Sequence, residues 1–337
     1  MFEVSGAPTT PRVSVVIPTY QRRELIRTIL APLMADPAAS EVVVVNDGGT
    51  DGTAYIVKQI AADDARLRLL DLPHRGRQQA RRAGVEAATG DIVLFIDDDV
   101  SADPGLVTGH ASAHREGLAD VIEGYMPVAV PAQRKPGQAA TFLYAREYEQ
   151  HCAQMERDQQ QTLFNLWGGN ISLRRELALR TTAGDQFPAS FGEDTHLGLL
   201  CHRLGLRGRF VRRLTARHLH SRTLPQFLRD AYQRGQAAVW LHHLHPDLVP
   251  APDRSQYTAG LPAPLRPAVE HNWPIARRAV EAGATGAGRM HSYRVEEAGV
   301  KLLRRWAAHQ GMVEALQALA TASAGAPAAD PDPTGVI

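Results

Sequence analysis

The sequence is poor in several features that would assign it to a physical class at once. Its 337 residues include two cysteines, Cys152 and Cys201, so no disulfide framework exists and we expect a reducing, cytoplasmic setting. No apolar run reaches the ~20 residues that span a bilayer, so we expect no transmembrane segment, and any membrane association would be peripheral. The formal net charge is +1, which gives no overall field for binding nucleic acid.

Two phosphate-binding motifs are also missing. Neither G-x-G-x-x-G nor G-x-x-x-x-G-K-[ST] occurs, which removes the main support for a Rossmann dinucleotide site or a P-loop. Lysine is scarce as well, with three among the 37 basic residues, so arginine dominates the whole chain. The six arginines between residues 203 and 217 are therefore weak evidence for a site, and a solvated surface is the simpler interpretation.

The first hundred residues alternate between strand and helix patterns. Strands are predicted at 12–17 (ended by Pro18), 41–45, 67–72 and 92–96, and helices at 22–34, after residue 53 and at 77–88. This alternation predicts an α/β fold with a doubly wound, mostly parallel sheet and helices on both faces. Ligands of such sheets bind where the strands end, and Thr19, Asp47 and Asp97 follow three of these strands.

The stretch GDIVLFIDDDV, residues 90–100, carries the strongest chemical signal. A strand buried on both faces runs directly into Asp97, Asp98 and Asp99. Three adjacent carboxylates repel one another, so either the triplet is a solvated turn that caps the next helix, or it holds a divalent metal and a diphosphate. The triplet alone does not decide between these two interpretations.

Three segments taken together carry a resemblance to a known family. In order and spacing, VSVVIPTYQRRELIRTIL, EVVVVNDGGTDGT and HRGRQQARRAGVEAATGDIVLFIDDDV resemble the amino-terminal half of family 2 glycosyltransferases with the GT-A fold. The resemblance implies a nucleoside-diphosphate sugar donor, most commonly a UDP sugar, and transfer of a hexosyl or N-acetylhexosaminyl group. The residues implied to bind the nucleotide sugar are Pro18, Thr19, Tyr20, Arg22, Asp47, Arg75, Gly76, Arg81, Asp97 and Asp98.

The same resemblance implies a metal at the acidic triplet. Asp97 to Asp99 match the DxD position of the family, so Asp99, with Asp97, is expected to hold Mn²⁺ or Mg²⁺. His218 and His220 point to the same side of a strand, and the family often places a histidine near this metal. We favour His220, while His218 remains open. The chain departs from the family at Arg82, where asparagine is usual, and at residues 46–49.

Two segments of the second half predict the acceptor side. Trp167, Gly168, Gly169 and Asn170 form a glycine-rich turn that either packs as a plain turn or contacts an acceptor, and the similarity to the family favours acceptor binding. Glu193 and Asp194 begin a predicted helix, where an acidic pair often only caps the helix. Their match to the ED motif of the family implies that Asp194 is the general base of an inverting transfer, with Glu193 beside it.

The remaining organisation is predicted as follows. A GT-A domain spans 1–240, with the nucleotide-sugar half at 12–110 and the acceptor half at 111–240; a helical appendage covers 241–324 and a disordered tail 325–337. The acceptor is left open among small molecules, lipid-linked saccharides and peptides, and so is a homodimer. Retaining transfer on the same fold, a nucleotidylyltransferase and a non-catalytic sugar-binding or nucleotide-binding protein are the alternative functions.

Overall fold

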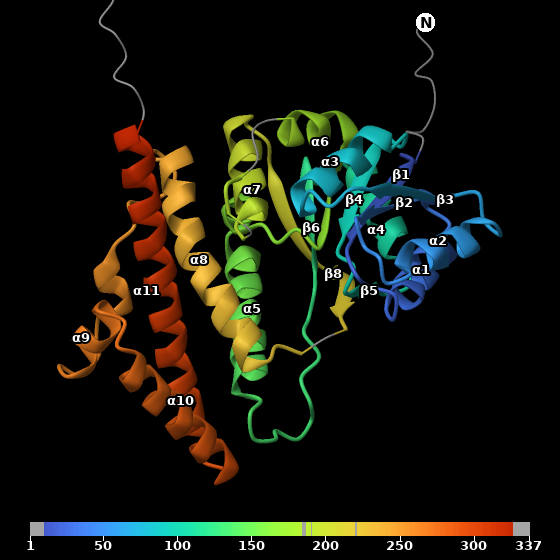
Figure 1. Ribbon diagram of the computed structural model, residues 1–337. Coiled ribbons are helices and arrows are strands. Elements are labelled where there is room, and N and C mark those ends of the chain that lie inside the picture. The colour runs from blue at the N-terminus through green and yellow to red at the C-terminus, as the bar shows by residue number, and fades with distance from the viewer. Residues whose placement is uncertain (1–9, 184–186, 190, 220, 326–337) are drawn as a thin grey trace, which may run out of the picture. The chain divides into compact units, whose positions relative to one another are not determined.

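The computed structural model describes residues 10–183, 187–189, 191–219 and 221–325. The chain divides into two compact units (Figure 1). The first comprises Met1–Pro188 and Gly192–Leu224, and the second comprises Ala189–Phe191 and Pro225–Ile337. The predicted boundary at residue 240 falls inside helix α8 (Leu224–Leu244). The predicted tail beyond residue 325 lies outside the described residues.

A mixed eight-stranded sheet forms the centre of the first unit in the described part of the chain. Its order is β3-β2-β1-β4-β7-β6-β8-β5. The first four strands in this order run parallel to one another, β7 runs antiparallel to both of its neighbours, and β6 and β8 are parallel. The strands are β1 (Val13–Thr19), β2 (Ala39–Asp47), β3 (Leu67–Leu72), β4 (Ile92–Ile96), β5 (Val100–Ala102), β6 (Val121–Tyr125), β7 (Asn170–Arg174) and β8 (Gly208–His218).

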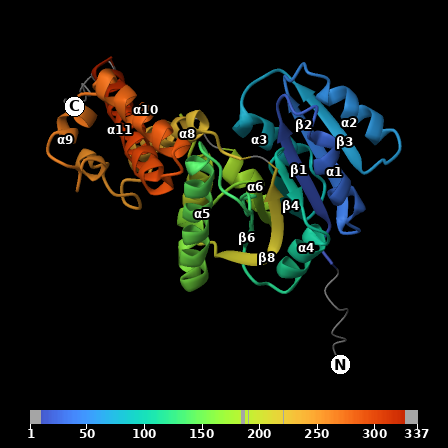
Figure 2. The same ribbon diagram turned by 90° about the horizontal axis from the view of Figure 1, so that it is seen from below.

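Strands β1, β2 and β4 are apolar along both faces because helices cover both faces of the sheet. Helices α1 (Ile26–Ala35), α2 (Thr53–Ala61), α4 (Leu106–Arg115) and α5 (Ala139–Arg157) pack on one face. Helices α3 (Arg77–Ala87), α6 (Arg175–Thr182) and α7 (Glu193–Arg203) pack on the other. Figure 2 shows α3 and α1 on opposite sides of the sheet. The predicted α/β class is confirmed.

Two details of the sheet differ from the sequence-based expectation. Strand β1 does not end at Pro18 but continues to Thr19, with Pro18 in register with Val45 of β2. Pro18 has no backbone N–H to donate to a neighbouring strand. The strand tolerates this because the pairing of β1 with β4 stops at Val16, before Pro18. The sequence of residues 208–214 predicts an edge strand, but strand β8 continues to His218 and is not at the edge of the sheet, since its last residues pair with the short edge strand β5.

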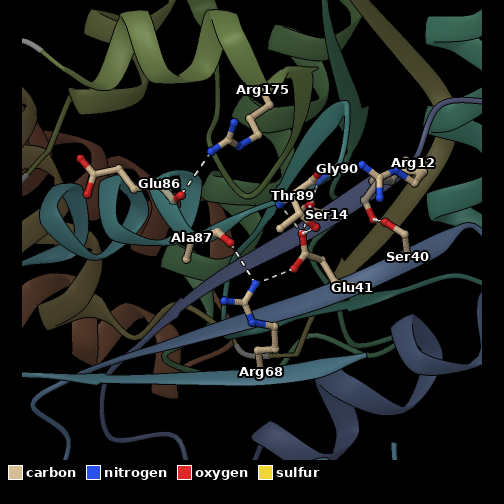
Figure 3. A network of polar contacts seen from close by, with 11 residues as sticks. Arg12, Ser14, Ser40, Glu41, Arg68, Glu86, Ala87, Thr89, Gly90 and Arg175 are labelled. Atoms are coloured by element: carbon tan, nitrogen blue, oxygen red, sulfur yellow. Dashed lines mark hydrogen bonds and ion pairs between the residues drawn. The ribbon is translucent and has the colours of Figure 1, made fainter. Parts of the chain in front are cut away.

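At the amino-terminal edge of this sheet, Glu41 is the centre of a polar network (Figure 3). Its Oε1 accepts hydrogen bonds from Ser14 Oγ at 2.6 Å, from Thr89 Oγ1 at 2.8 Å and from the Thr89 backbone N–H. Its Oε2 accepts from Arg68 Nη1 at 2.9 Å. Burial raises the pKa of Glu41, but the hydrogen bonds from Ser14 and Thr89 outweigh this and lower the pKa to about 2.

The second unit is helical in its described residues. It contains most of α8, then α9 (Leu265–Glu270), α10 (Pro274–Arg289), α11 (Tyr293–Gly325) and the 3-10 turn η3 (Arg254–Tyr257). Trp306 of α11 is fully buried, and its indole N–H donates to Asn272 Oδ1 at 2.8 Å. A helical region at the carboxyl-terminal end is thus confirmed. None of the described helices combines the length and the apolar character that crossing a bilayer requires.

Candidate active site

The carboxyl ends of β1, β2 and β4 surround a pocket of about 220 Å³ in the first unit. Eight of the residues predicted from the sequence line it: Pro18, Thr19, Tyr20, Arg22, Asp47, Asp97, Asp98 and Asp99. The structure therefore brings together the three polar clusters that follow these strands. The other lining residues are His74, Arg77 and Ala80, which the sequence analysis did not single out.

Asp47, at the end of β2, fixes the loop that opens α3. Its carboxylate accepts hydrogen bonds from the backbone N–H groups of Arg75 at 2.7 Å and of Gly76 at 2.9 Å. Gly76 has a φ of 91°, a conformation that glycine adopts without strain. His74 lies 2.9 Å from the same carboxylate and stacks against Tyr20, with ring centroids 4.7 Å apart. The predicted residues Arg75 and Gly76 thus bond to a lining residue, Asp47, without lining the pocket themselves.

Asp98 and Asp99 lie beside one another and beside Arg22. Asp98 accepts from the backbone N–H of Tyr20 at 3.1 Å and from Arg22 Nε at 3.0 Å, and Asp99 Oδ2 lies 3.9 Å from Arg22 Nη2. Burial raises the pKa of Asp98, and burial together with the charge of Asp97 raises the pKa of Asp99. The ionised forms of these two carboxyl groups are therefore less favourable here than in water.

Arg81 links the acidic triplet to the acidic pair on α7. It is 5% exposed and donates hydrogen bonds to Asp194 Oδ1, to Asp97 Oδ1 at 3.2 Å and to the Gly168 carbonyl at 3.0 Å. Burial would raise the pKa of Asp97, but Arg77 and Arg81 lower it below its ordinary value. Asp97 and Asp194 are more than ninety residues apart in the sequence, and one guanidinium group holds both.

Glu193 and Arg77 form the second ion pair across the site, with Arg77 Nη1 3.3 Å from Glu193 Oε1. Burial and the neighbouring charge of Asp194 raise the pKa of Glu193 to about 7. Arg77 precedes Arg81 by one helical turn, so both point from the same face of α3. This i, i+4 spacing was the signal in the sequence that could have identified Arg77.

The predicted acceptor turn, residues 167–170, contacts the site through its backbone. A Cβ atom on Gly168 would lie 1.9 Å from Asp194 Oδ1, and one on Gly169 would lie 2.8 Å from Asp97 Oδ2, so both positions need glycine. The Trp167 ring packs against Tyr148, with centroids 4.8 Å apart. Asn170 is fully buried, so its side chain lies beneath the turn instead of facing an acceptor.

The residues present fit a divalent cation bound together with a diphosphate. Asp97 to Asp99 supply the hard oxygen donors that Mg²⁺ and Mn²⁺ prefer. Thr19 Oγ1 is buried at the pocket without a hydrogen-bond partner. No group of three or more His, Cys, Asp or Glu side chains in the described residues is arranged to hold a metal ion by itself.

Of the two histidines predicted to lie near the metal, His218 belongs to the described part of the chain and His220 lies outside it. His218 is 7% exposed at the end of β8, and its Nδ1 lies 3.2 Å from the Met126 carbonyl oxygen. Asp97 and Asp99 lie close enough to His218 that a positive charge on its ring would act to lower the pKa of each carboxyl group. At Asp99 the effects of burial and of Asp97, which raise the pKa, are larger. His218 is therefore placed near the acidic triplet.

The fold and this site define a GT-A glycosyltransferase-type protein, and comparison with known proteins agrees. Residues 14–180 match the model of the family described as "Glycosyl transferase family 2". An N-acetylglucosaminyltransferase of Azorhizobium caulinodans is 29% identical over 245 residues, which cover 68% of this chain and 60% of that relative. The protein named uncharacterized glycosyltransferase YibD, from Escherichia coli K12, is 37% identical over 92 residues, 27% of each chain.

Among solved structures, the chain is similar to the mannosyltransferase PcManGT of Pyrobaculum calidifontis in complex with GDP-Man and Mn²⁺. The TM-score is 0.55 at 20% identity, covering 92% of this chain and 90% of that one, so the likeness shows the fold. Residues 14–180, about half of the chain, thus form a domain of glycosyl transferase family 2, as the motifs indicated. The chain spans about 60% of the length of its Azorhizobium relative.

Proposed function

We propose that this protein is a metal-dependent, inverting glycosyltransferase that uses a nucleoside-diphosphate sugar. The observation that carries the proposal is that Asp47 and the triplet Asp97 to Asp99 line one pocket, while Arg81 joins Asp97 of this triplet to Asp194. A donor site needs a nucleoside pocket beside a cation site, and the transfer needs a base. Arg77 and Arg81 contact the residues proposed here for the cation site and for the base.

The nucleoside end of the donor would lie against Thr19, Tyr20 and Asp47. Tyr20 is 46% exposed, and its ring, stacked on His74, offers a flat apolar surface for a base. Asp47 would accept hydrogen bonds from the base or the ribose. UDP is the donor nucleoside that we favour, with GDP as the second candidate because the structurally similar mannosyltransferase binds GDP-Man.

The diphosphate would lie between the acidic triplet and the arginines. Asp99 and Asp97 would hold Mn²⁺ or Mg²⁺, which when bound supplies Lewis-acid stabilisation of the leaving diphosphate. Arg22 and Arg77 line the same pocket, and their guanidinium groups would bind phosphate oxygens. Asp98 would keep Arg22 oriented through its hydrogen bond to Nε.

Asp194 would remove the proton from the acceptor hydroxyl as that oxygen attacks the anomeric carbon. Arg81 donates a hydrogen bond to Asp194 Oδ1, which orients this carboxyl group beside Asp97. The pKa of Glu193, raised to about 7, makes this neighbour partly protonated near neutral pH, and its protonated form can donate a hydrogen bond to a sugar hydroxyl. The two acids would thus have different roles, set by their different arginine contacts.

A thermal-shift experiment tests the donor site. UDP, GDP and dTDP are each added with and without Mn²⁺, and we expect one nucleotide to raise Tm by several degrees only when the metal is present. Asp99→Asn should abolish this shift, whereas the control Asp103→Asn, which removes only an exposed ion pair with Arg217, should retain it. If no nucleotide gives a metal-dependent shift, the proposal is wrong.

The stereochemistry of the product tests the inverting mechanism. The donor identified in this way is incubated with candidate small-molecule, lipid-linked and peptide acceptors, and products are detected by mass. The anomeric configuration of the new bond is then read by NMR. Retention of the donor configuration would favour the alternative, retaining transfer on the same fold, and would remove the role given to Asp194.

A further inference from the structure

A chain of buried polar side chains lies beneath the Gly168–Gly169 turn, and the proposed transfer makes no use of it. His110 and His114 of α4 and Ser172 and Asn170 of β7 form this chain, called here the His110 network. His110 Nδ1 lies 2.7 Å from Ser172 Oγ, and His110 Nε2 lies 2.9 Å from Asn170 Oδ1. His114 Nε2 lies 2.8 Å from the same Ser172 Oγ.

The directions of the hydrogen bonds in the network follow from one contact and from burial. Asn170 Nδ2 donates to the Leu214 carbonyl of β8 at 3.0 Å, so Asn170 Oδ1 must accept from His110 Nε2–H. Burial lowers the pKa of His110 to about 3 and that of His114 to about 4, so both imidazoles are neutral at pH 7. His110 Nδ1 therefore carries no proton and accepts a hydrogen bond from the Ser172 hydroxyl, whose oxygen in turn accepts from His114 Nε2–H.

Gly124 of β6 leaves the space through which Asn170 reaches β8. A Cβ atom at Gly124 would lie 2.1 Å from Asn170 Nδ2 and 2.5 Å from the Leu214 carbonyl oxygen. The amide of Asn170 thus passes over β6 at the one residue that has no side chain. The missing side chain at Gly124 is needed because Asn170 of β7 bonds to β8, and β6 lies between these two strands.

Asn170 also connects the network to the groups of the site. It directly follows Gly169, and it pairs with Ile96, the residue before Asp97, across β7 and β4. The carbonyl of Gly169 accepts from the Asp97 backbone N–H at 3.2 Å, and the carbonyl of Gly168 accepts from Arg81 Nη2 at 3.0 Å. Moving Asn170 would therefore move two acceptors that orient Asp97 and Arg81.

We propose that His110 is a positioning residue: through Asn170 it fixes the Gly168–Gly169 turn and thereby the geometry of Asp97, Arg81 and Asp194. The catalytic consequence rests on the proposed function. The network itself does not, because its hydrogen bonds can be measured without any substrate. His110 is fully buried, so it acts only through its neighbours.

Histidine NMR tests the network independently of activity. We expect ¹⁵N shifts of His110 typical of a neutral ring protonated at Nε2, with no titration between pH 5 and 8. Asn170→Asp keeps the shape but places a carboxylate beside Nε2, so His110 should become protonated within this range. A charged His110 in the wild-type protein, or a ring protonated at Nδ1, would overturn the proposal.

The kinetic consequence is tested with His110→Leu, His110→Gln and the control His114→Leu. The assay follows hydrolysis of the sugar donor, UDP-GlcNAc or GDP-mannose, whose nucleotide passes the thermal-shift test. His110→Leu should lower kcat by ~10- to 100-fold with KM changed by less than about threefold, since small displacements of catalytic groups have effects of this size. His110→Gln, which keeps an N–H donor toward Asn170, should recover part of kcat.

His114 shares Ser172 with His110 but does not touch Asn170. His114→Leu should therefore lower Tm while kcat stays within about threefold of wild type. Equal kcat losses in His110→Leu and His114→Leu would mean that the network only stabilises the core, and would overturn the proposal. If His110→Leu does not fold, Gly124→Ala, which displaces the Asn170 amide, provides the same comparison. Failure of the donor test with the expected NMR result would contradict the proposed function and leave the network as described.

Discussion

Two polar clusters lie at opposite ends of the strands of the same sheet, one at their amino-terminal ends and one at their carboxyl ends. Both contain carboxylates and arginines. At the amino-terminal edge, Glu41 accepts from two hydroxyl groups, a backbone N–H and Arg68, and these contacts lower its pKa to about 2. At the carboxyl edge, burial raises the pKa of Asp98 and Asp99, and that of Glu193 reaches about 7.

The difference lies in which effect dominates the pKa of the acids. Hydrogen bonds outweigh burial at Glu41, so its negative charge stabilises the folded state. At Asp98, Asp99 and Glu193, burial and the charge of neighbouring acids dominate, a pattern that is common at functional sites. We therefore expect a bound cation to stabilise the second cluster and not the first. Substitutions should separate the two clusters by their effects on stability and on activity.

The largest effect is expected at Asp194. Asp194→Asn should lower kcat for transfer by ~10²- to 10⁴-fold, because the amide cannot take the proton of the acceptor. The Tm should change by only a few degrees, since Arg81 keeps its contacts with Asp97 and Gly168. Steady-state kinetics and thermal unfolding measure the two quantities, with Glu86→Gln on the exposed surface as the control. Transfer near the wild-type rate would refute the assignment of the base.

Glu41→Gln should show the reverse pattern, with a large effect on stability and none on turnover per folded molecule. The substitution removes the negative charge to which Ser14, Thr89 and Arg68 all donate, and we expect a loss of about 2–3 kcal/mol in the free energy of unfolding at pH 7. Urea unfolding measures this loss. A variant that loses activity while keeping its stability would show that the two edges are not separate.

The pH dependence of stability should reveal the same residue. The pKa of Glu41 is lower in the folded state than in the unfolded state, where it is near 4.5, so its stabilisation is present above pH 4.5. It is lost as the pH falls from about 4.5 to 2, because the folded state must then take up a proton against its hydrogen bonds. We expect the free energy of unfolding, measured with urea between pH 2 and 7, to depend less steeply on pH in Glu41→Gln than in wild type. An equal pH dependence in the two proteins would contradict this.

A smaller effect of opposite sign is expected at Asp99. In the absence of metal, Asp99→Asn should raise the free energy of unfolding at pH 7 by about 1 kcal/mol, because it removes a charge that lies close to Asp97. Chemical unfolding in EDTA tests this, and a repeat with Mn²⁺ and UDP should show that the variant gains no stability from them. A lower free energy of unfolding of Asp99→Asn than of wild type in EDTA would mean that neighbouring groups already neutralise the charge of the triplet.

The smallest effect is expected at Arg68, the exposed partner in the Glu41 network. Its side chain is 42% exposed, so solvent screens its ion pair, and Arg68→Met should cost less than about 1 kcal/mol. Glu41 would still accept from Ser14 and Thr89. A loss as large as that of Glu41→Gln would place most of the stabilisation in the ion pair.

Much of the first unit followed from local sequence patterns. The β-branched runs of β1, β2 and β4 are apolar on both faces, which predicted buried parallel strands. The carboxyl ends of such strands share one sheet edge, so the convergence of Thr19, Asp47 and Asp97 was also predictable. Strand continuation through Pro18 was not, because it depends on where β4 leaves β1.

Other parts of the site could not be read from sequence spacing. His74 belongs to a loop without a recognisable motif, and its contact with Asp47 places it beside the pocket. Asn170 was predicted to contact an acceptor because its segment is similar to the family, and in the structure its side chain bonds to His110 and to β8. Which way a strand residue points depends on the register between β7 and its neighbours.

The sequence by itself determined the α/β class, the family and the acids that follow the strands, because hydrophobic periodicity and short ordered motifs are local properties of the chain. Only the tertiary structure decided how those acids are paired. One guanidinium group, Arg81, joins Asp97 to Asp194, and a neutral histidine lies beneath the turn that both contact. These contacts join residues that are 16 to 113 positions apart, and only the packing of the sheet brings them within hydrogen-bond distance.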